Sequence, residues 1–357
     1  MTKVKKKISF EGQNIYVGLD VHKKQWTVCV CTEHTNFRPF VIDPDPVLLI
    51  SYLAREFPDG EYLCAYEAGF SGYGLYEALW EAHINCIVVH AADIPTSHKE
   101  SEFKTDKRDA LKIVKSLRSG DLTGIAIPDK QLQEDRSLVR FRQQLRRDIV
   151  RQKCRIKSLL AFYSILLPKE WEKSKWNKGM RHWLWNLKLC TEEGNKTIHL
   201  QMGMLEYIRG MCANTDNHLR ALSRTERYKV QVDLLMTVVG FGRRRAIEFL
   251  VELGDIKRFK NLNQISNYVG LVPSSNNSGN RVNQTELTTR GHKQLRTMLI
   301  EAAWTSINTD PAMAQKYGQL KKRMLGQQAI VSIARKLLNR VRYVLLHEQD
   351  YQKGTKA

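Results

Sequence analysis

Long apolar runs are missing from this sequence of 357 residues. No stretch approaches the roughly 18 consecutive apolar residues that a membrane span needs. The first ten residues, MTKVKKKISF, include basic side chains but no apolar core of a signal peptide. We therefore expect neither membrane anchorage nor secretion, and we place the protein in the cytoplasm.

Cysteine, proline and glycine are also sparse. The seven cysteines are an odd number and form no C-x-x-C pair, so we interpret them as reduced core residues and not as disulfides. Nine prolines and 21 glycines exclude collagen-like and low-complexity chains. With 42% hydrophobic residues, the chain is long enough to form more than one folded core.

Acidic residues are too few to balance the basic ones. There are 57 Lys and Arg against 37 Asp and Glu, which gives a formal charge of +20 and a pI of about 9.6. Such a surplus is typical of nucleic-acid-binding proteins, because neutralising phosphates releases counterions. The alternative is a soluble basic protein without an anionic partner. The charge indicates an anionic partner but does not indicate whether the protein catalyses a reaction.

Residues 10–125 have the pattern of a mixed α/β domain. Runs rich in Val, Ile and aromatics predict strands, and apolar residues at spacings of three and four predict helices. The expected order is β-β-β-α-β-α-β-α, with strands at 14–21, 25–31, 37–42, 61–67 and 84–90 and helices at 46–57, 73–82 and 107–118. Three meander strands followed by alternating helices and strands predict an RNase-H-like sheet.

Residues 126–229 have the pattern of a basic helical linker. Residues 134–160 hold nine Lys or Arg, and one apolar helical face is made by Leu138, Phe141, Leu145, Ile149, Ile156 and Tyr163. We expect this face to pair with another helix of the same chain or of a second protomer, while the outer face meets phosphates; a solvated helix is the alternative. For the tryptophan-rich segment 171–185 we favour a local helical core over a base-stacking platform.

Residues 230–350 are predicted to form an all-α domain. An apolar helix ends at Gly240-Phe241-Gly242, and Arg243 opens the next helix. In a helix-hairpin-helix, such glycines let backbone N–H groups approach a DNA phosphate. Residues 272–283 show no regular pattern and predict a loop, followed by a basic helix at 292–307 and a final helix at 329–348.

Four acids stand where an RNase-H-like fold can bring them together. Asp20 lies late in the first strand, Glu67 ends the fourth, and Asp106 and Asp109 lie three apart at the start of a helix. Carboxylates that hold divalent cations can activate a nucleophile and stabilise the leaving oxygen in phosphodiester chemistry. Singly, each acid has a structural explanation, such as the helix dipole for the last two. The set of four in fold order favours a divalent-metal site.

The histidines give a weaker signal than the acids. No His/Cys cluster suggests zinc. We interpret His22, His90 and His98 as turn or packing residues.

Six segments, in order, resemble the DEDD-type transposases of insertion sequences, which act as bridge-RNA-guided recombinases. They are YVGLDVHKKQWTV, CAYEAGFSGYGL, KTDKRDALKI, VVGFGRRRAIEFLVELGDIKRF, YVGLVPSSNNSG and TTRGHKQLRTMLIEAAW. The resemblance covers about 14–117 and 235–304. It implies a RuvC-like N-terminal domain, a coiled-coil linker and a C-terminal transposase domain in a bacterial or archaeal, nucleoid-associated protein.

The resemblance also implies roles for particular residues. Asp20, Glu67, Asp106 and Asp109 would bind Mg²⁺, and Ser278, followed by Gly279, would attack DNA to form a transient phosphoserine link. A serine nucleophile needs activation, and glycine permits close backbone approach to DNA. The family shares active sites between protomers, so a homodimer or tetramer on DNA is expected, together with an element-encoded bridge RNA.

One family motif is altered here. Where the family commonly has G-N-x-x-L-R, this chain has Gly291-His292-Lys293-Gln294-Leu295-Arg296, and His292 is expected to cap the helix or to contact DNA. Arg281, Arg290, Lys293 and Arg296 are candidate phosphate contacts, although each has a solvated surface role as its alternative.

The residues leave two competing functions open. In the first, the four acids activate water in a hydrolytic junction nuclease and Ser278 takes no part. In the second, the acids are structural and the protein only binds nucleic acid.

Overall fold

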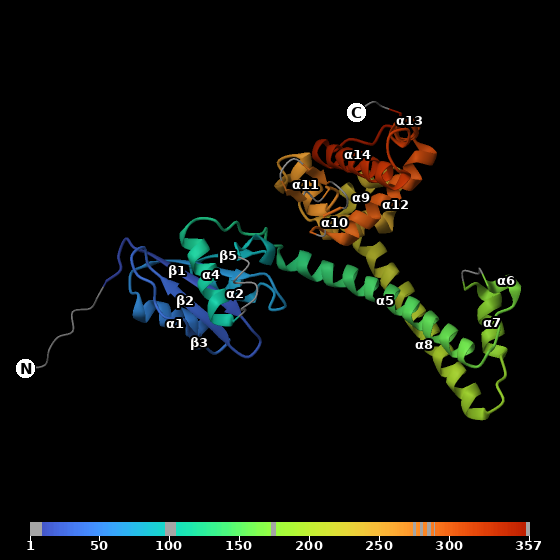
Figure 1. Ribbon diagram of the computed structural model, residues 1–357, viewed down its shortest axis with the longest axis horizontal. Helices are drawn as coiled ribbons and strands as arrows, with labels where there is room; N and C mark the ends of the chain where they lie inside the picture. The colour runs from blue at the N-terminus through green and yellow to red at the C-terminus, as the bar shows by residue number, and fades with distance from the viewer. Residues whose placement is uncertain are drawn as a thin grey trace, which may run out of the picture. The chain divides into compact units, whose positions relative to one another are not determined.

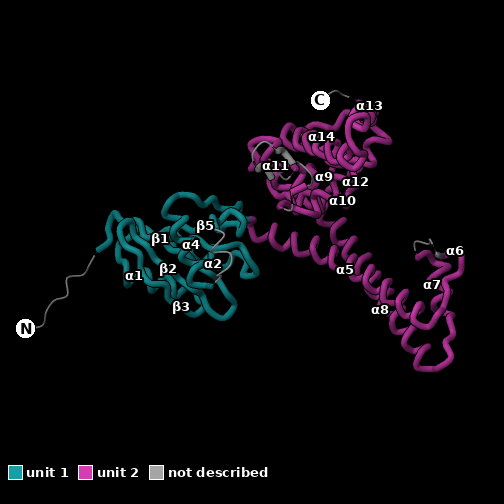
Figure 2. Tube along the Cα trace, viewed as in Figure 1, with its two compact units in different colours: residues 1–127 teal, residues 128–357 magenta. Residues whose placement is uncertain are grey.

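The computed structural model describes residues 9–96, 105–172, 176–273, 276–278, 281–283, 287–288 and 290–354. The chain divides into two compact units, residues 1–127 and 128–357 (Figure 2). The expected linker and C-terminal domain both fall within the second unit, and the boundary at 229/230 stays a prediction. No helix in the described ranges is long and apolar enough to cross a membrane.

The first unit contains a mixed five-stranded sheet in the order β3-β2-β1-β4-β5 (Figure 1). The strands are β1 (Asn14–Val21), β2 (Trp26–Cys31), β3 (Phe40–Ile42), β4 (Glu61–Glu67) and β5 (Asn85–Val89). The first three pair antiparallel, and β4 lies parallel to both β1 and β5. The mixed α/β arrangement expected for an RNase-H-like domain is therefore present. β3 is shorter than expected and starts after Pro39, which has no N–H to donate to a ladder.

Helices cover both faces of this sheet. Helices α1 (Pro46–Glu56) and α2 (Gly74–Glu81) share one core with β1 residues Ile15, Val17 and Leu19. Helix α4 (Asp106–Arg118) packs on the other face, where Ala110 and Val114 contact Cys29 and Cys31. A short 3₁₀ turn, Ala91–Asp93, follows β5 and was not predicted. The two-residue period of a strand sends the alternate residues of β1, including Asp20, to the α4 face.

A glycine sets the distance between α4 and the sheet. A Cβ built on Gly18 would lie 2.5 Å from both the Ala110 carbonyl oxygen and the Val114 nitrogen. Only a residue without a side chain fits under α4 at this point. The helix therefore lies directly on β1 at Gly18, two residues before Asp20.

The second unit contains two long antiparallel helices, α5 (Lys130–Phe162) and α8 (Glu192–Leu222). Leu145 contacts Ile208 and Cys212, and farther along α5, Ile156 and Leu160 contact Ile198, Met202 and Leu205. The long basic helix thus pairs with another helix of the same chain. Its expected apolar face was partly wrong: Phe141 and Tyr163 are exposed, whereas Val139 and Leu160 are buried. The first half of α5 also packs on α10. The residues buried there therefore lie on a different side of the helix from those buried against α8.

Three of the basic side chains of α5 contact other groups of the same unit. Arg142 is buried and lies 2.5 Å from Asp216 and 3.1 Å from Glu248. Arg136 donates to the Val251 carbonyl, and Arg140 contacts Glu252 at 3.1 Å. The expectation that these side chains meet phosphates was wrong for Arg142, because its guanidinium is surrounded by protein.

The tryptophans of the middle segment form the expected local core. Helices α6 (Lys169–Glu172) and α7 (Lys178–Asn186) precede α8, and Trp176, Met180 and Leu184 are buried against α5 and α8. Trp171 and Trp183 pack on this cluster, whereas Trp185 is partly exposed beside His199. The cysteine prediction holds for five of the seven residues, because Cys154 and Cys190 are exposed.

The remaining elements form a helical core. They are α9 (Lys229–Thr237), α10 (Arg243–Leu253), the 3₁₀ turn Ile256–Arg258, α11 (Leu262–Val269), α12 (Lys293–Thr309), α13 (Pro311–Lys321) and α14 (Gly326–His347). All six α-helices from α9 to α14 contribute buried residues to one cluster. The predicted loop at 272–283 was wrong in one respect: β6 (Asn276–Ser278) and β7 (Arg281–Asn283) pair as a short antiparallel hairpin.

Candidate metal centre

Two acids lie at the edge of the sheet where the parallel strands end. Asp20 is the penultimate residue of β1, and Glu67 is the last residue of β4. The two strands run parallel with Leu19 opposite Tyr66. Because parallel strands end at the same edge, both carboxylates reach the same opening of the fold.

The other two acids come from the first turn of α4. Asp106 and Asp109 are both in this turn, and Thr105 at the N-cap makes no side-chain cap bond. Acidic residues at this position are favoured by the helix dipole. The close contact of α4 with Gly18 brings this turn up to the end of β1.

All four acids line one cavity of about 410 Å³. The other lining residues are Val21, His22, Gly69 and Phe70. The fold thus brings together the four acids that the sequence singled out, although they are spread over ninety positions of the chain. Their role as metal ligands stays a prediction.

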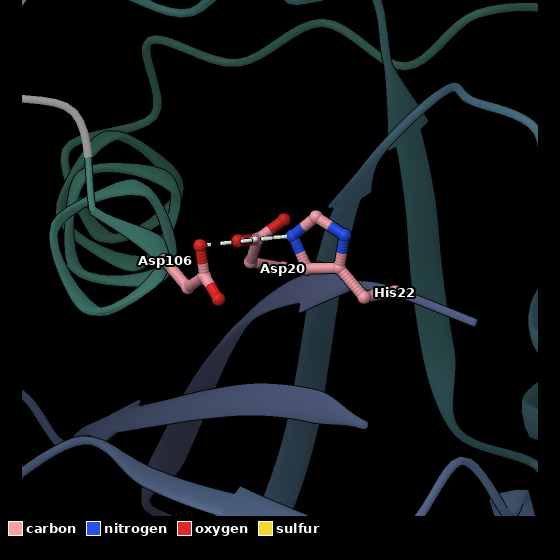
Figure 3. A group of neighbouring side chains, drawn as sticks. All are labelled: Asp20, His22 and Asp106. Carbon is pink, nitrogen blue, oxygen red and sulfur yellow. Dashed lines mark hydrogen bonds and ion pairs between the residues drawn. The ribbon is translucent and has the colours of Figure 1, made fainter. Parts of the chain in front are cut away.

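His22 belongs to the same cluster (Figure 3). Its Nε2 lies 3.2 Å from Asp20 Oδ2 and 3.8 Å from Asp106 Oδ1. We had interpreted His22 as a turn residue, and its backbone does form the turn to β2 by donating to Gln25. That interpretation did not include the position of the side chain beside Asp20 and Asp106. The D-x-H spacing was the available signal, since residues two apart on a strand point to the same face. His90 is a turn residue as expected, and His98 lies outside the described residues.

The electrostatics of the site favour a cation. Burial raises the pKa of Asp20 above its usual value, His22 opposes this shift, and the negative charges of Asp106 and Asp109 raise the pKa further. Asp109 has a cationic neighbour, Lys112, at 3.1 Å. Carboxylates that destabilise one another's charged form are stabilised when a divalent cation lies between them. The donor set of carboxylate oxygens and one imidazole therefore fits a divalent metal.

Ser278, the predicted nucleophile, is in the second unit. It ends β6, with its backbone paired to Arg281 of β7. The side chains of Ser278 and Arg281 and the whole of Gly279 lie outside what the structure describes. At the base of this hairpin, Pro273 pairs with Leu287, and Thr288 N donates to Val272 O. Backbone pairing therefore joins the two ends of the segment that contains the hairpin.

Two glycines close the base of the same segment. Gly270 and Gly291 both have positive φ angles, of 81° and 117°. A Cβ on Gly291 would lie 2.6 Å from the Gly270 Cα, so the two backbones pack directly on each other. Arg296 donates to the carbonyls of Gly270 and Thr288, which spans the two sides of the junction. Arg296 is half-buried and contributes to this junction, and its candidate role as a phosphate contact stays a prediction.

The other candidate DNA contacts differ in their surroundings. Gly240 lies against α12, since its Cβ would be 2.7 Å from the Ala302 Cα, whereas a Cβ on Gly242 would meet nothing within 4 Å. Arg243 pairs with Asp233 at 3.0 Å. Arg290 and Lys293 are exposed beside the start of α12. His292 caps α12 as expected: its Nδ1 accepts from Leu295 N, and its Nε2 lies 3.1 Å from the buried Glu252.

Two family profiles match the chain, one over the first unit and helix α5 and the other after helix α8. Residues 17–165 match the DEDD transposases of the IS110 group, and residues 232–318 match the transposases of the IS116/IS110/IS902 family. The chain belongs to the IS110 family of transposases. The resemblance noted in the sequence motifs is thereby confirmed, and both the acid site and the Ser278 segment fall within matched ranges.

The chain is similar to several curated relatives over different shares of its length. A putative transposase, y4qE, of Sinorhizobium fredii is 30% identical over 68% of this chain and 58% of its own length. The transposase of insertion sequence IS1533 from Leptospira borgpetersenii is 28% identical over 70% of this chain and 72% of its own length. A pilin gene-inverting protein of Moraxella lacunata is 28% identical over 35% of this chain and 39% of its own length. The chain thus spans somewhat over half of the first relative.

Proposed function

We propose that this protein is the transposase of an insertion sequence, a recombinase that cleaves, exchanges and rejoins DNA strands in the presence of Mg²⁺. One observation carries the proposal: the four acids from β1, β4 and α4 line a single cavity. Membership of a transposase family supports the same conclusion. The relatives named as transposases support DNA as the substrate.

In this proposal, Asp20, Glu67, Asp106 and Asp109 hold the metal at the end of the sheet. A bound divalent cation supplies charge stabilisation for the phosphate oxygens that change during cleavage. The protein contributes the position of each carboxylate, which is fixed by strand ends and by a helix that rests on Gly18. Sites built on strands and helices hold their ligands more accurately than sites on loops.

Ser278 is the nucleophile in the same proposal. Its oxygen bonds to phosphorus and the bond from phosphorus to the leaving deoxyribose oxygen breaks, while the proton lost by the serine hydroxyl is balanced by the one that the leaving oxygen gains to become a hydroxyl. A hydroxyl of the incoming strand then attacks the phosphoserine, which releases Ser278 and rejoins the DNA. The hairpin base, tied by Gly270, Gly291 and Arg296, supports this role because it restricts the segment that carries Ser278.

The finer elements of the proposal concern partners. We propose that α9 and α10 act as a helix-hairpin-helix and that α5 and α8 form the coiled-coil linker of the family. Gly242, Gly279, Arg243, Arg281, Arg290 and Lys293 are the proposed DNA contacts, and an element-encoded bridge RNA selects the sites. A dimer or tetramer assembles on DNA, with protomers completing each other's sites.

A denaturing gel tests the proposal. The full-length protein is mixed with junction DNA of its element, RNA from the flanking non-coding region and MgCl₂, and a covalent protein–DNA band is sought. We expect the band to disappear in Ser278→Ala and in Asp20→Asn, and to remain in the control Ser275→Ala, which removes a serine of the same segment. Cleavage without a band, unaffected by Ser278→Ala, would instead identify a hydrolytic nuclease. DNA binding with no reaction in any preparation would leave only a binding protein.

A further inference from the structure

The side chain of His22 contributes a nitrogen to a cluster otherwise made of carboxylate oxygens. One donor atom each from His22, Asp20 and Asp106 can be chosen so that all three lie within 4.8 Å of one another. The ring is about half exposed, and Asp20 beside it is only 19% exposed. The imidazole is therefore held at the cavity by the turn that follows β1 and not by packing in the core.

The distances fit donors around one ion. In an octahedral site with ligands about 2.1 Å from the metal, neighbouring donors lie about 3 Å apart and opposite donors about 4.2 Å apart. His22 Nε2 is 3.2 Å from one carboxylate oxygen and 3.8 Å from another. An ion placed among these atoms needs only small side-chain rotations to contact all of them.

A hydrogen bond between His22 and Asp20 would not explain why the His22 ring also lies near Asp106. His22 lies between residues of two elements, the end of β1 and the first turn of α4, and its Nε2 faces the carboxylates of both (Figure 3). Convergence of an imidazole nitrogen on two carboxylates is the arrangement of a mixed nitrogen and oxygen metal site.

We propose that His22 is a direct ligand of the divalent metal, so that this centre is a mixed nitrogen–oxygen site that favours Mn²⁺ and Co²⁺ more strongly than four carboxylates alone would. The inference rests on the proposed metal centre and adds a ligand to it. Imidazole binds transition metals well, whereas Mg²⁺ and Ca²⁺ prefer oxygen ligands. His22 therefore sets the metal preference.

Electron paramagnetic resonance of bound Mn²⁺ tests the proposal directly. The full-length protein is loaded with Mn²⁺, and the electron spin echo envelope is examined for coupling to a directly bound ¹⁴N nucleus. We expect this coupling in the wild type and its loss in His22→Ala and His22→Gln. The glutamine offers an oxygen in place of Nε2. His34→Ala removes an exposed histidine of the β2–β3 turn and is the matched control, which should keep the signal.

Metal affinities give a second measurement. Calorimetric titration should show Mn²⁺ affinity falling about tenfold or more in His22→Ala, since loss of groups that only support a ligand already costs about that much. Mg²⁺ affinity should fall by a smaller factor, and His22→Gln should recover Mg²⁺ binding without restoring the Mn²⁺ preference. Thermal unfolding of the metal-free variants should match that of the wild type.

Two results would overturn the proposal in different ways. If Asp20→Asn abolishes Mn²⁺ binding while His22→Ala changes neither the affinity nor the spin-echo signal, the metal centre stands and His22 is only an ion partner of Asp20. If Asp20→Asn leaves Mn²⁺ binding intact, the proposed metal centre itself fails, and the role of His22 fails with it.

Discussion

The contact between Gly18 and α4 should control both the stability of the first unit and its acid site. In Gly18→Ala the new methyl carbon would lie 2.5 Å from backbone atoms of Ala110 and Val114 and 2.8 Å from the Val114 Cβ. Ordinary contacts between such atoms are about 3.5 Å, so α4 must retreat by about 1 Å. No flexible side chain can relieve the clash, because the nearest atoms belong to the helix backbone.

The retreat has two measurable consequences. Overpacking of this kind destabilises a core by about 1–3 kcal/mol. Asp106 and Asp109 move with the helix, and a misplacement of about 1 Å can reduce catalysis by about 10²-fold. We therefore expect faster hydrogen exchange in β1 and α4, weaker Mn²⁺ binding, and a loss of strand cleavage on the order of 100-fold.

Gly74→Ala is the matched control. Gly74 begins α2 in the same unit, and its added Cβ would meet nothing within 4 Å. Alanine in a helix is favoured over glycine by up to about 1 kcal/mol, so this variant should be neutral or slightly more stable. Hydrogen exchange followed by mass spectrometry compares the two variants peptide by peptide. Equal exchange in β1 and α4, with unchanged Mn²⁺ affinity in Gly18→Ala, would refute the argument.

Two further predictions concern the second unit. Gly240→Ala should destabilise it by about 1–3 kcal/mol, because the methyl group meets Ala302 of α12 and φ is +87°; urea unfolding of Gly242→Ala, where the space is open, should show a smaller change. Contacts with His292 and Arg140 overcome burial and lower the pKa of Glu252 from 4.5 to about 2, so its stabilisation is present above pH 4.5 and is lost as the pH falls toward 2. It amounts at most to a few kcal/mol, on the order of 3. Unfolding between pH 5 and 2 should therefore depend less steeply on pH in Glu252→Gln; an unchanged slope would exclude this carboxylate as the cause.

The elements of the first unit were predictable because their sequence periods are simple. Strands β1, β2 and β4 are runs of Val, Leu, Cys and Tyr, and buried side chains fill both faces of β2. The order of strands and helices along the chain predicted an RNase-H-like sheet. Position along those strands then predicted the convergence of Asp20 and Glu67. Register within α5 was less predictable, because two different partners, α8 and α10, bury different stripes of one helix.

The role of His22 could not be deduced from local pattern alone. Its backbone makes a turn, as its polar neighbours indicated, and only the approach of α4 reveals that its ring also faces Asp106. The same limit applies to Arg142 and Arg296. Both look like solvated cations in sequence, but their partners lie far along the chain, at Asp216 and Glu248 for one and at Gly270 and Thr288 for the other.

The glycines of the family motifs explain how distant segments are brought close enough to form each site. Gly18 of G-L-D-V lets α4 lie on β1 beside Asp20, and Gly270 of Y-V-G-L meets Gly291 of R-G-H-K beneath the Ser278 hairpin. In both units, a contact between two backbones fixes the segment that carries a proposed catalytic residue. Such a contact depends on the missing Cβ and not on side-chain chemistry, so any other residue at these positions changes the geometry of the site without touching its reactive groups. Loss of activity in Gly291→Ala with Ser278 intact would therefore follow from the position of the hairpin.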